Sequence, residues 1–193
     1  TFPEWMHHLE RLPLGVNLSQ LVPVTPLVGY VLRDWEAKGR QPSPRETAEI
    51  VRLLDEALDA GAIGWSSQRL PPESLASFQR DHDGTPFISD VLSDEFYLAL
   101  ATALGARDRG CIQYTQVTAT RDGKRGAADD FAFIRQLAEQ SGRPLLFNAI
   151  TINDEFPESF RSQLRWLDET NARGNRVFGQ ASSVRIPVTF TFE

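Results

Sequence analysis

Two kinds of hydrophobic pattern alternate along the chain. Short apolar runs bounded by glycine, proline or charged residues are typical of buried strands, and they are followed by longer stretches with apolar residues every three or four positions, which indicate amphipathic helices. The predicted strands are Val16–Val22, Ala62–Ser66, Cys111–Val117, Leu145–Ile150 and Arg176–Gln180. Because helices separate successive strands, we expect parallel pairing with right-handed crossovers.

The clearest helix signal follows Ser43. Ser43 can cap the helix, Pro44 suits its first position, and Glu46 completes a capping box. Further helices are predicted over Phe2–Arg11 and Thr25–Lys38, after Ser93, around Ile134 and Leu137, and after Pro157. The later strands begin about 32 residues apart, the length of one strand–helix unit in an eight-unit barrel. We therefore expect an α/β fold: a partial TIM-type (β/α) barrel of about five parallel strands alternating with helices.

Strand-borne apolar side chains are the expected core. We predict that seven of them are largely buried: Ile63, Trp65, Ile112, Tyr114, Leu145, Phe147 and Phe178. Cys111, at the start of a strand, is expected to be a small core residue. The C-terminal stretch Val184–Phe192 favours β-structure, and the long irregular stretch Gln68–Leu92 is predicted to be a loop of the kind that is usually functional or mobile.

The amino-acid composition limits the functions that the chain can have. The 193 residues carry 20 basic and 26 acidic side chains, a net charge of -6, so nucleic acid is not an expected partner. No apolar run approaches the roughly 20 residues of a membrane-spanning helix. A single cysteine excludes an intramolecular disulfide, and only three histidines are available as metal ligands.

Polar residues gather where the predicted strands end. In parallel barrels the carboxyl ends of the strands carry the active site. The candidate pocket residues are Ser67, Gln68, Arg69, Gln113 and Asn148. Arg69 is the expected ligand for a substrate carboxylate, because a guanidinium binds carboxylates with two hydrogen bonds.

The histidines are poorly placed for metal binding. His7 and His8 are neighbours on a terminal helix and point about 100° apart. His82 lies between Asp81 and Asp83; this group could supply metal ligands, but the following Asp-Gly is typical of a solvated turn. The chain also lacks a G-x-S-x-G elbow, a P-loop and a G-x-G-x-x-G motif, which weakens serine-hydrolase, nucleotidase and dehydrogenase interpretations.

Three passages resemble N-acyl-D-amino-acid deacylases of the amidohydrolase superfamily, which are metal-dependent barrel hydrolases. The passages are Thr1–Trp5 with Leu9–Pro13 and Val16-Asn17, then Ala57–Ser66, then Glu139–Leu145. The resemblance implies that residues 1–193 are the central segment of such a barrel and lack its first and last strands.

The same resemblance implies zinc bound by strand-borne histidines, and here the chain departs from the family. The expected histidine of the fifth barrel strand falls near Thr115 or Gln116, and that of the sixth falls on Asn148-Ala149. No lysine lies on the predicted strand that follows Gly61, so a carboxylated lysine that bridges two metal ions is not available there. We therefore expect zinc in a whole family member, but none bound by this chain alone.

The resemblance implies hydrolysis of a non-peptide C–N amide bond in an N-acyl amino acid-like small molecule, by a bacterial cytoplasmic enzyme when whole. This chain alone is expected to be inactive. The alternative is a non-catalytic barrel relative that binds a small ligand or a partner; a third possibility is an unrelated parallel α/β binding domain. Five strands cannot close a barrel, so the open sheet edges also predict self-association or a missing covering segment.

Overall fold

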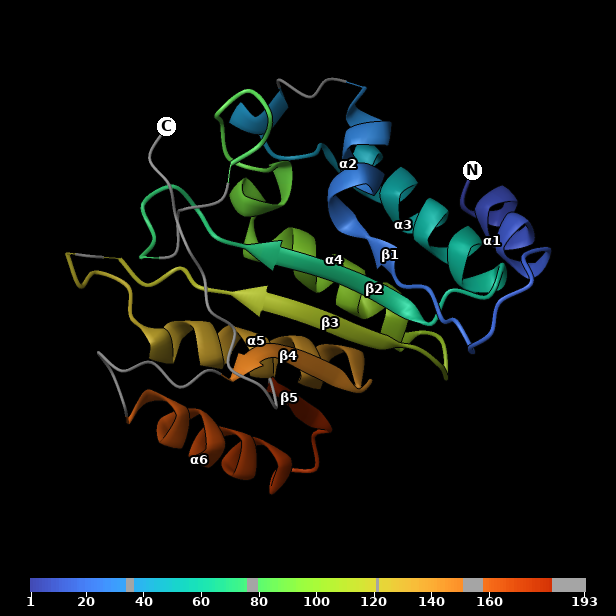
Figure 1. Cartoon of the computed structure of the whole chain (residues 1–193). Helices are drawn as coiled ribbons and strands as arrows, with labels where there is room; N and C mark the ends of the chain where they lie inside the picture. The colour runs from blue at the N-terminus through green and yellow to red at the C-terminus, as the bar shows by residue number, and fades with distance from the viewer. Residues whose placement is uncertain (34–36, 76–79, 121, 151–157, 182–193) are drawn as a thin grey trace.

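Five parallel strands form one sheet in the computed structural model, which describes residues 1–33, 37–75, 80–120, 122–150 and 158–181. The strands are β1 (Val22–Pro23), β2 (Gly64–Arg69), β3 (Cys111–Gln116), β4 (Leu145–Ile150) and β5 (Val177–Ala181). They lie side by side in chain order, and every neighbouring pair is parallel (Figure 1). The predicted α/β class, a partial (β/α) barrel with alternating strands and helices, is confirmed.

Helices connect the strands. They are α1 (Phe2–Glu10), α2 (Val24–Leu32), α3 (Pro44–Asp59), α4 (Asp94–Gly105), α5 (Ala127–Ser141) and α6 (Ser159–Asn171), with short 3-10 helices η1 (Ala37–Gly39) and η2 (Ile88–Val91). The predicted capping box of α3 is present: the Glu46 amide donates to Ser43 Oγ at 3.3 Å, and the Ser43 amide donates to Glu46 Oε2 at 2.7 Å. None of the described helices is long and apolar enough to cross a membrane.

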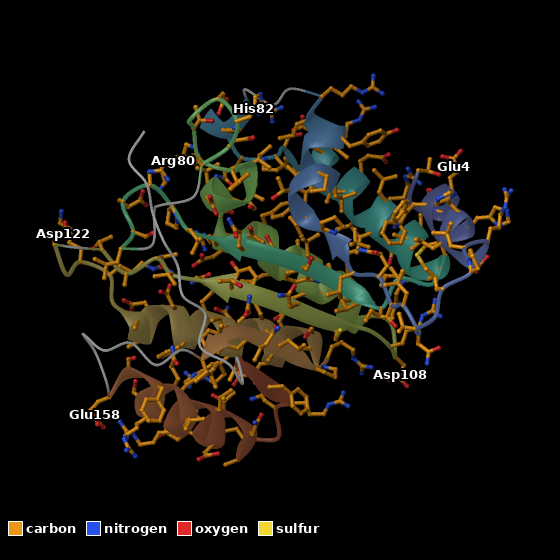
Figure 2. All side chains as sticks on the ribbon, viewed as in Figure 1. Glu4, Arg80, His82, Asp108, Asp122 and Glu158 are labelled. Atoms are coloured by element: carbon orange, nitrogen blue, oxygen red, sulfur yellow. The ribbon has the colours of Figure 1, made fainter. Side chains whose placement is uncertain are left out.

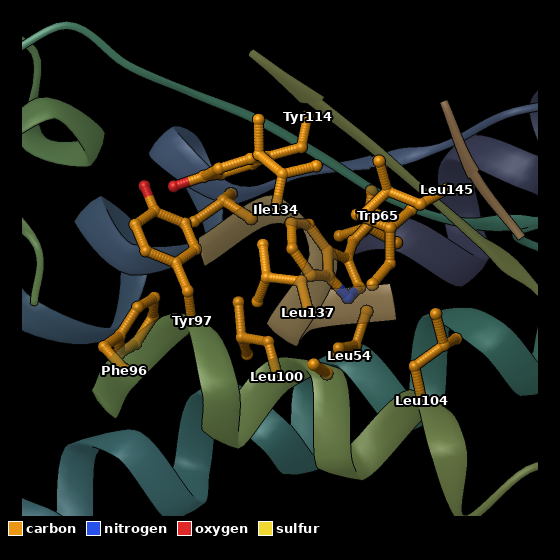
Figure 3. Packing of buried hydrophobic residues seen from close by; sticks show 14 of the residues in the cluster. Leu54, Trp65, Phe96, Tyr97, Leu100, Leu104, Tyr114, Ile134, Leu137 and Leu145 are labelled. Atoms are coloured by element: carbon orange, nitrogen blue, oxygen red, sulfur yellow. The ribbon is translucent and has the colours of Figure 1, made fainter. Parts of the chain in front are cut away.

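Helices α4 and α5 cover one face of the sheet, which we call the helix face (Figure 1). Five predicted core residues are buried there: Trp65, Ile112, Tyr114, Leu145 and Phe147. Figure 3 shows Trp65 and Tyr114 packed beside Tyr97 of α4. Burying one large apolar side chain contributes about 1.5–3 kcal/mol, so each of these residues stabilises the packing of the helices on the sheet.

The prediction of burial is wrong for Ile63 and Phe178, which are 40% and 57% exposed. Phe178 pairs with Leu146, whereas its neighbour Val177 pairs with buried Leu145. Side chains alternate between the faces of a strand, so Phe178 points away from the helices. Cys111 is only half-buried, because it lies at the beginning of β3 on this same uncovered side.

The predicted strand Val16–Val22 is largely wrong. Only Val22 and Pro23 form β1, opposite Trp65 and Ser66, while Val16 is 75% exposed. An apolar run becomes a strand only where a neighbouring backbone accepts its hydrogen bonds, and the described sheet offers that pairing only at the end of this run.

Two helix boundaries also differ from the predictions. The expected helix Thr25–Lys38 ends at Leu32, because Arg33 adopts a left-handed conformation with φ 53°. Helix α6 begins at Ser159. Pro157 and the predicted β-prone tail Val184–Phe192 lie outside the described residues.

Candidate functional site

A row of polar side chains crosses four strands at their carboxyl ends. Gln68 pairs with Thr115, and Asn148 pairs with Gln180. The two pairs meet because Tyr114 pairs with Phe147, the residues immediately before Thr115 and Asn148. Register partners in a parallel sheet share a face and lie about 4.8 Å apart. We call Gln68, Thr115, Asn148 and Gln180 the polar row.

The polar row lies on the sheet face opposite the helix face. Gln113, one layer below it, pairs with Ser66 and Leu146. The side chains of Gln68, Gln113 and Asn148 are all partly exposed. The structure therefore brings three of the predicted pocket residues to one accessible surface, where amide groups can donate to and accept from a bound ligand.

Ser67 and Arg69 lie on the helix face. Ser67 Oγ is 3.0 Å from the Tyr97 hydroxyl. Arg69 donates to Asp94 at the start of α4, and its guanidinium lies 5.8 Å from the centre of the Phe133 ring. The alternation of side chains along β2 separates these two residues from Gln68, so they do not share a surface with the polar row.

A buried hydrogen-bond network under the carboxyl end of β3 was not predicted from the sequence. The Tyr114 hydroxyl donates to Gln116 Oε1 at 2.9 Å, and Gln116 Nε2 donates to Asp130 Oδ1 at 2.9 Å. Asp130 also accepts from the Thr118 amide at 2.8 Å. Burial raises the pKa of the Tyr114 hydroxyl, so it remains a neutral donor. The sequence signal that could have revealed this network is Asp130, an acidic residue in the first turn of α5. The network fixes the loop that follows β3.

A cavity of about 350 Å³ lies between the loops that follow β2 and β3; we call it the rim cavity. Its lining residues are Arg69, Pro71, Pro72, Glu73, Asp90, Val91, Thr118, Thr120 and Arg125. The Asp90 carboxylate is buried and accepts from the amides of Leu70 at 2.8 Å and Phe87 at 3.3 Å. Burial raises the pKa of Asp90 to about 6.

The described residues do not fit a zinc site. His7 and His8 are exposed on α1, and the His82 side chain is 85% exposed at the periphery of the molecule (Figure 2). Asp81 is already engaged: it accepts from Lys38 Nζ at 2.8 Å and lies 2.9 Å from His82 Nδ1. Hydrogen bonds from Lys38 and His82 hold its pKa well below the ordinary value.

Across the described ranges, no three histidine, cysteine or carboxylate side chains come together to hold a metal ion. The polar row supplies only amide and hydroxyl oxygens, which are poor zinc ligands.

Comparison with curated proteins finds similar sequences, although no family model matches the chain. It is 42% identical over 77 residues to N-acyl-D-aspartate deacylase from Alcaligenes xylosoxydans xylosoxydans, a match covering 39% of this chain and 15% of the relative. It is 34% identical over 95 residues to an uncharacterized protein of Mycobacterium tuberculosis, covering 48% of this chain and 14% of that protein.

Solved structures share the fold. D-aminoacylase, described as defining a novel subset of amidohydrolases, superimposes with a TM-score of 0.67 at 17% identity. N-acyl-D-glutamate deacylase from Bordetella bronchiseptica, solved with zinc and a phosphonate inhibitor, gives 0.66 at 18%. Each match covers 91% of this chain and 32% of the other.

These matches place the fold in the class of D-aminoacylase-like (β/α) barrels. The resemblance of this chain to N-acyl-D-amino-acid deacylases of the amidohydrolase superfamily is confirmed. The chain spans 15% of the length of the deacylase it matches in sequence and about a third of its structural neighbours.

Proposed function

We propose that this chain is the central segment of a metal-dependent amidohydrolase that cleaves the C–N bond of an N-acyl-D-amino acid. The observation that carries the proposal is the polar row, which stands at the carboxyl ends of parallel strands on the fold of D-aminoacylase. In barrel enzymes this end of the sheet holds the substrate. The proposed central segment comprises residues 1–193 and lacks the first and last strands of the barrel.

The proposed role of the described residues is to bind and orient the substrate. Amide N–H groups of Gln68, Gln113 and Asn148 donate to the acyl carbonyl or the carboxylate, and their carbonyl oxygens accept from the scissile N–H group. Zinc is proposed as the cofactor of the whole protein, with ligands from outside the described residues. Orientation of the substrate by fixed side chains lowers the entropic barrier to hydrolysis.

A non-catalytic relative that binds a small ligand is the second candidate. It is favoured by the lack of histidine at the two places where the family resemblance implies one, Thr115 or Gln116 on β3 and Asn148-Ala149 on β4. Thr115 and Asn148 lie in the polar row, and neither is a zinc ligand of ordinary strength. This candidate predicts saturable binding of N-acyl-D-amino acids without hydrolysis.

The proposal is tested by measuring release of free amino acid from N-acetyl-D-amino acids. The assay compares the full-length gene product that includes this chain, loaded with zinc, and the 193-residue chain alone, which is expected to be inactive. In the former, Gln113→Leu and Asn148→Ala are each expected to lower kcat/KM about tenfold or more, because a ligand group loses its hydrogen-bond partner.

The matched control is Gln140→Leu, an exposed amide on α5 away from the polar row. Hydrolysis that is unaffected by Gln113→Leu and Asn148→Ala would contradict the assigned role of the polar row. Binding of the substrates without any turnover would instead establish the second candidate.

The sheet edges support a separate proposal of association. Within the described residues, β1 and β5 are the ends of the sheet and have no strand on their outer sides. An apolar cavity of about 250 Å³ borders β1, where Phe2, Val22 and Leu27 contribute to its wall. Self-association, or covering by another segment, is expected to hide these edges, and light scattering over a concentration series tests it.

A further inference from the structure

Arg125 and Glu73 line the same rim cavity without forming an ion pair. Among the described residues, neither side chain is within ion-pair distance of an opposite charge. Arg125 Nε is buried and has no hydrogen-bond partner, and the same is true of Arg69 Nε. Because the Arg125 side chain lines the cavity and has no carboxylate partner among the described residues, it favours an occupant that carries an anionic group.

Backbone contacts join the two loops that carry these charges. The loop of Glu73 and the loop of Arg125 are linked by an antiparallel bridge between Ser74 and Thr120. The Arg125 loop is closed on itself, since Thr120 N donates to Arg125 O at 2.9 Å. The backbone on this side of the cavity is therefore held by hydrogen bonds.

The charged residues that line the cavity favour a ligand that carries both a positive and a negative group. Asp94 neutralises Arg69, and the positive charge of Arg80 acts on Asp90. This leaves the cation of Arg125 and the carboxylate of Glu73 as the charges of opposite sign that line the cavity. A simple anion would be repelled by the Glu73 carboxylate, and a simple cation by the Arg125 guanidinium. A cavity of about 350 Å³ lies in the size range of small-molecule sites.

We propose that the rim cavity binds a small zwitterion, a free α-amino acid, with its carboxylate on Arg125 and its ammonium group on Glu73. This site is separate from the polar row, because Arg69 and Thr118 at its wall extend toward the helix face, where they contact α4 and α5. It does not depend on amide hydrolysis by this protein. A free amino acid is also the amine product that the proposed reaction would release. Occupancy of the rim cavity would therefore rise with the concentration of that product.

Calorimetric titration of the 193-residue chain, at constant ionic strength, tests the proposal. The probes are glycine and D-alanine, with acetate and ethylammonium as single-charge controls. Glycine or D-alanine is expected to bind saturably, and each single-charge probe at least tenfold more weakly. Arg125→Gln and Glu73→Gln are each expected to weaken amino-acid binding at least tenfold, whereas Arg45→Gln, an exposed arginine in the first turn of α3, leaves it unchanged.

Circular dichroism of the variants checks that the fold is retained, and Glu73→Gln alters an exposed side chain. The proposal is overturned if neither amino acid binds, if acetate binds as tightly as glycine, or if both variants titrate like the unmodified chain. None of these results bears on hydrolysis of N-acyl-D-amino acids, so failure here is distinguishable from failure of the proposed function.

Discussion

Replacing Gly64 by alanine should break the junction between β2 and β3. Gly64 has φ +141°, and a Cβ atom added there would lie 1.8 Å from the Cys111 carbonyl oxygen and 2.7 Å from its carbonyl carbon. The backbone conformation alone costs an L-residue about 1–3 kcal/mol. Relief of the clash requires the strands to separate, which weakens bonds such as Cys111 N to Ile63 O at 2.9 Å, each worth about 1 kcal/mol.

The expected loss for Gly64→Ala is therefore about 3–5 kcal/mol in the free energy of unfolding, a large share of a typical domain's stability. Gly123→Ala is the matched control: φ is +72°, but nothing lies within 4 Å of its added Cβ. Its expected cost is about 1–2 kcal/mol. Urea unfolding followed by the fluorescence of buried Trp65 measures both. Equal losses for the two variants would refute the argument from backbone contact.

Three further predictions concern buried groups and metal. Because burial raises the pKa of Asp90 to about 6 from 3.8, the folded chain keeps a proton that the unfolded chain has released between these values. Its free energy of unfolding therefore falls as pH rises through that window, and Asp90→Asn should remove this fall in urea midpoints; parallel pH curves would contradict it. Tyr97→Phe removes a bond to Ser89 O at 2.7 Å and should cost about 1–2 kcal/mol, whereas Tyr30→Phe, at a residue 66% exposed, should not. After dialysis against a mild chelator, elemental analysis of the chain should find no stoichiometric zinc. About one zinc ion per chain would contradict the conclusion that the described residues do not fit a zinc site.

Much of the fold could be predicted because its signals are local. The Ser43–Glu46 capping box, with Pro44 at the first helical position, determines the start of α3 without help from the rest of the chain. The alternating pattern of β3 and the apolar run of β4 are likewise local signals, and the separation of these strands by a helix is enough to predict parallel pairing.

The candidate site depended on tertiary structure. The residues Ser67, Gln68 and Arg69 are adjacent in sequence and equally polar, and the alternation of the strand sends only Gln68 to the polar row. Alternate side chains along β2 point to opposite faces of the sheet. The packing of α4 and α5 against Trp65 and its neighbours decides which set faces the helices, and no local sequence pattern contains that information.

What the sequence alone determined is therefore the order and type of most elements, because caps and hydrophobic periods act over a few residues. Only the tertiary structure decided that Val16 and Phe178 stay exposed, since burial requires a covering layer that the chain must supply from elsewhere. The same holds for the rim cavity, which Glu73 and Arg125 line from two loops joined by the Ser74–Thr120 bridge. Contacts between distant residues follow from the geometry of the packed sheet, and an apolar or charged pattern along the chain does not specify them.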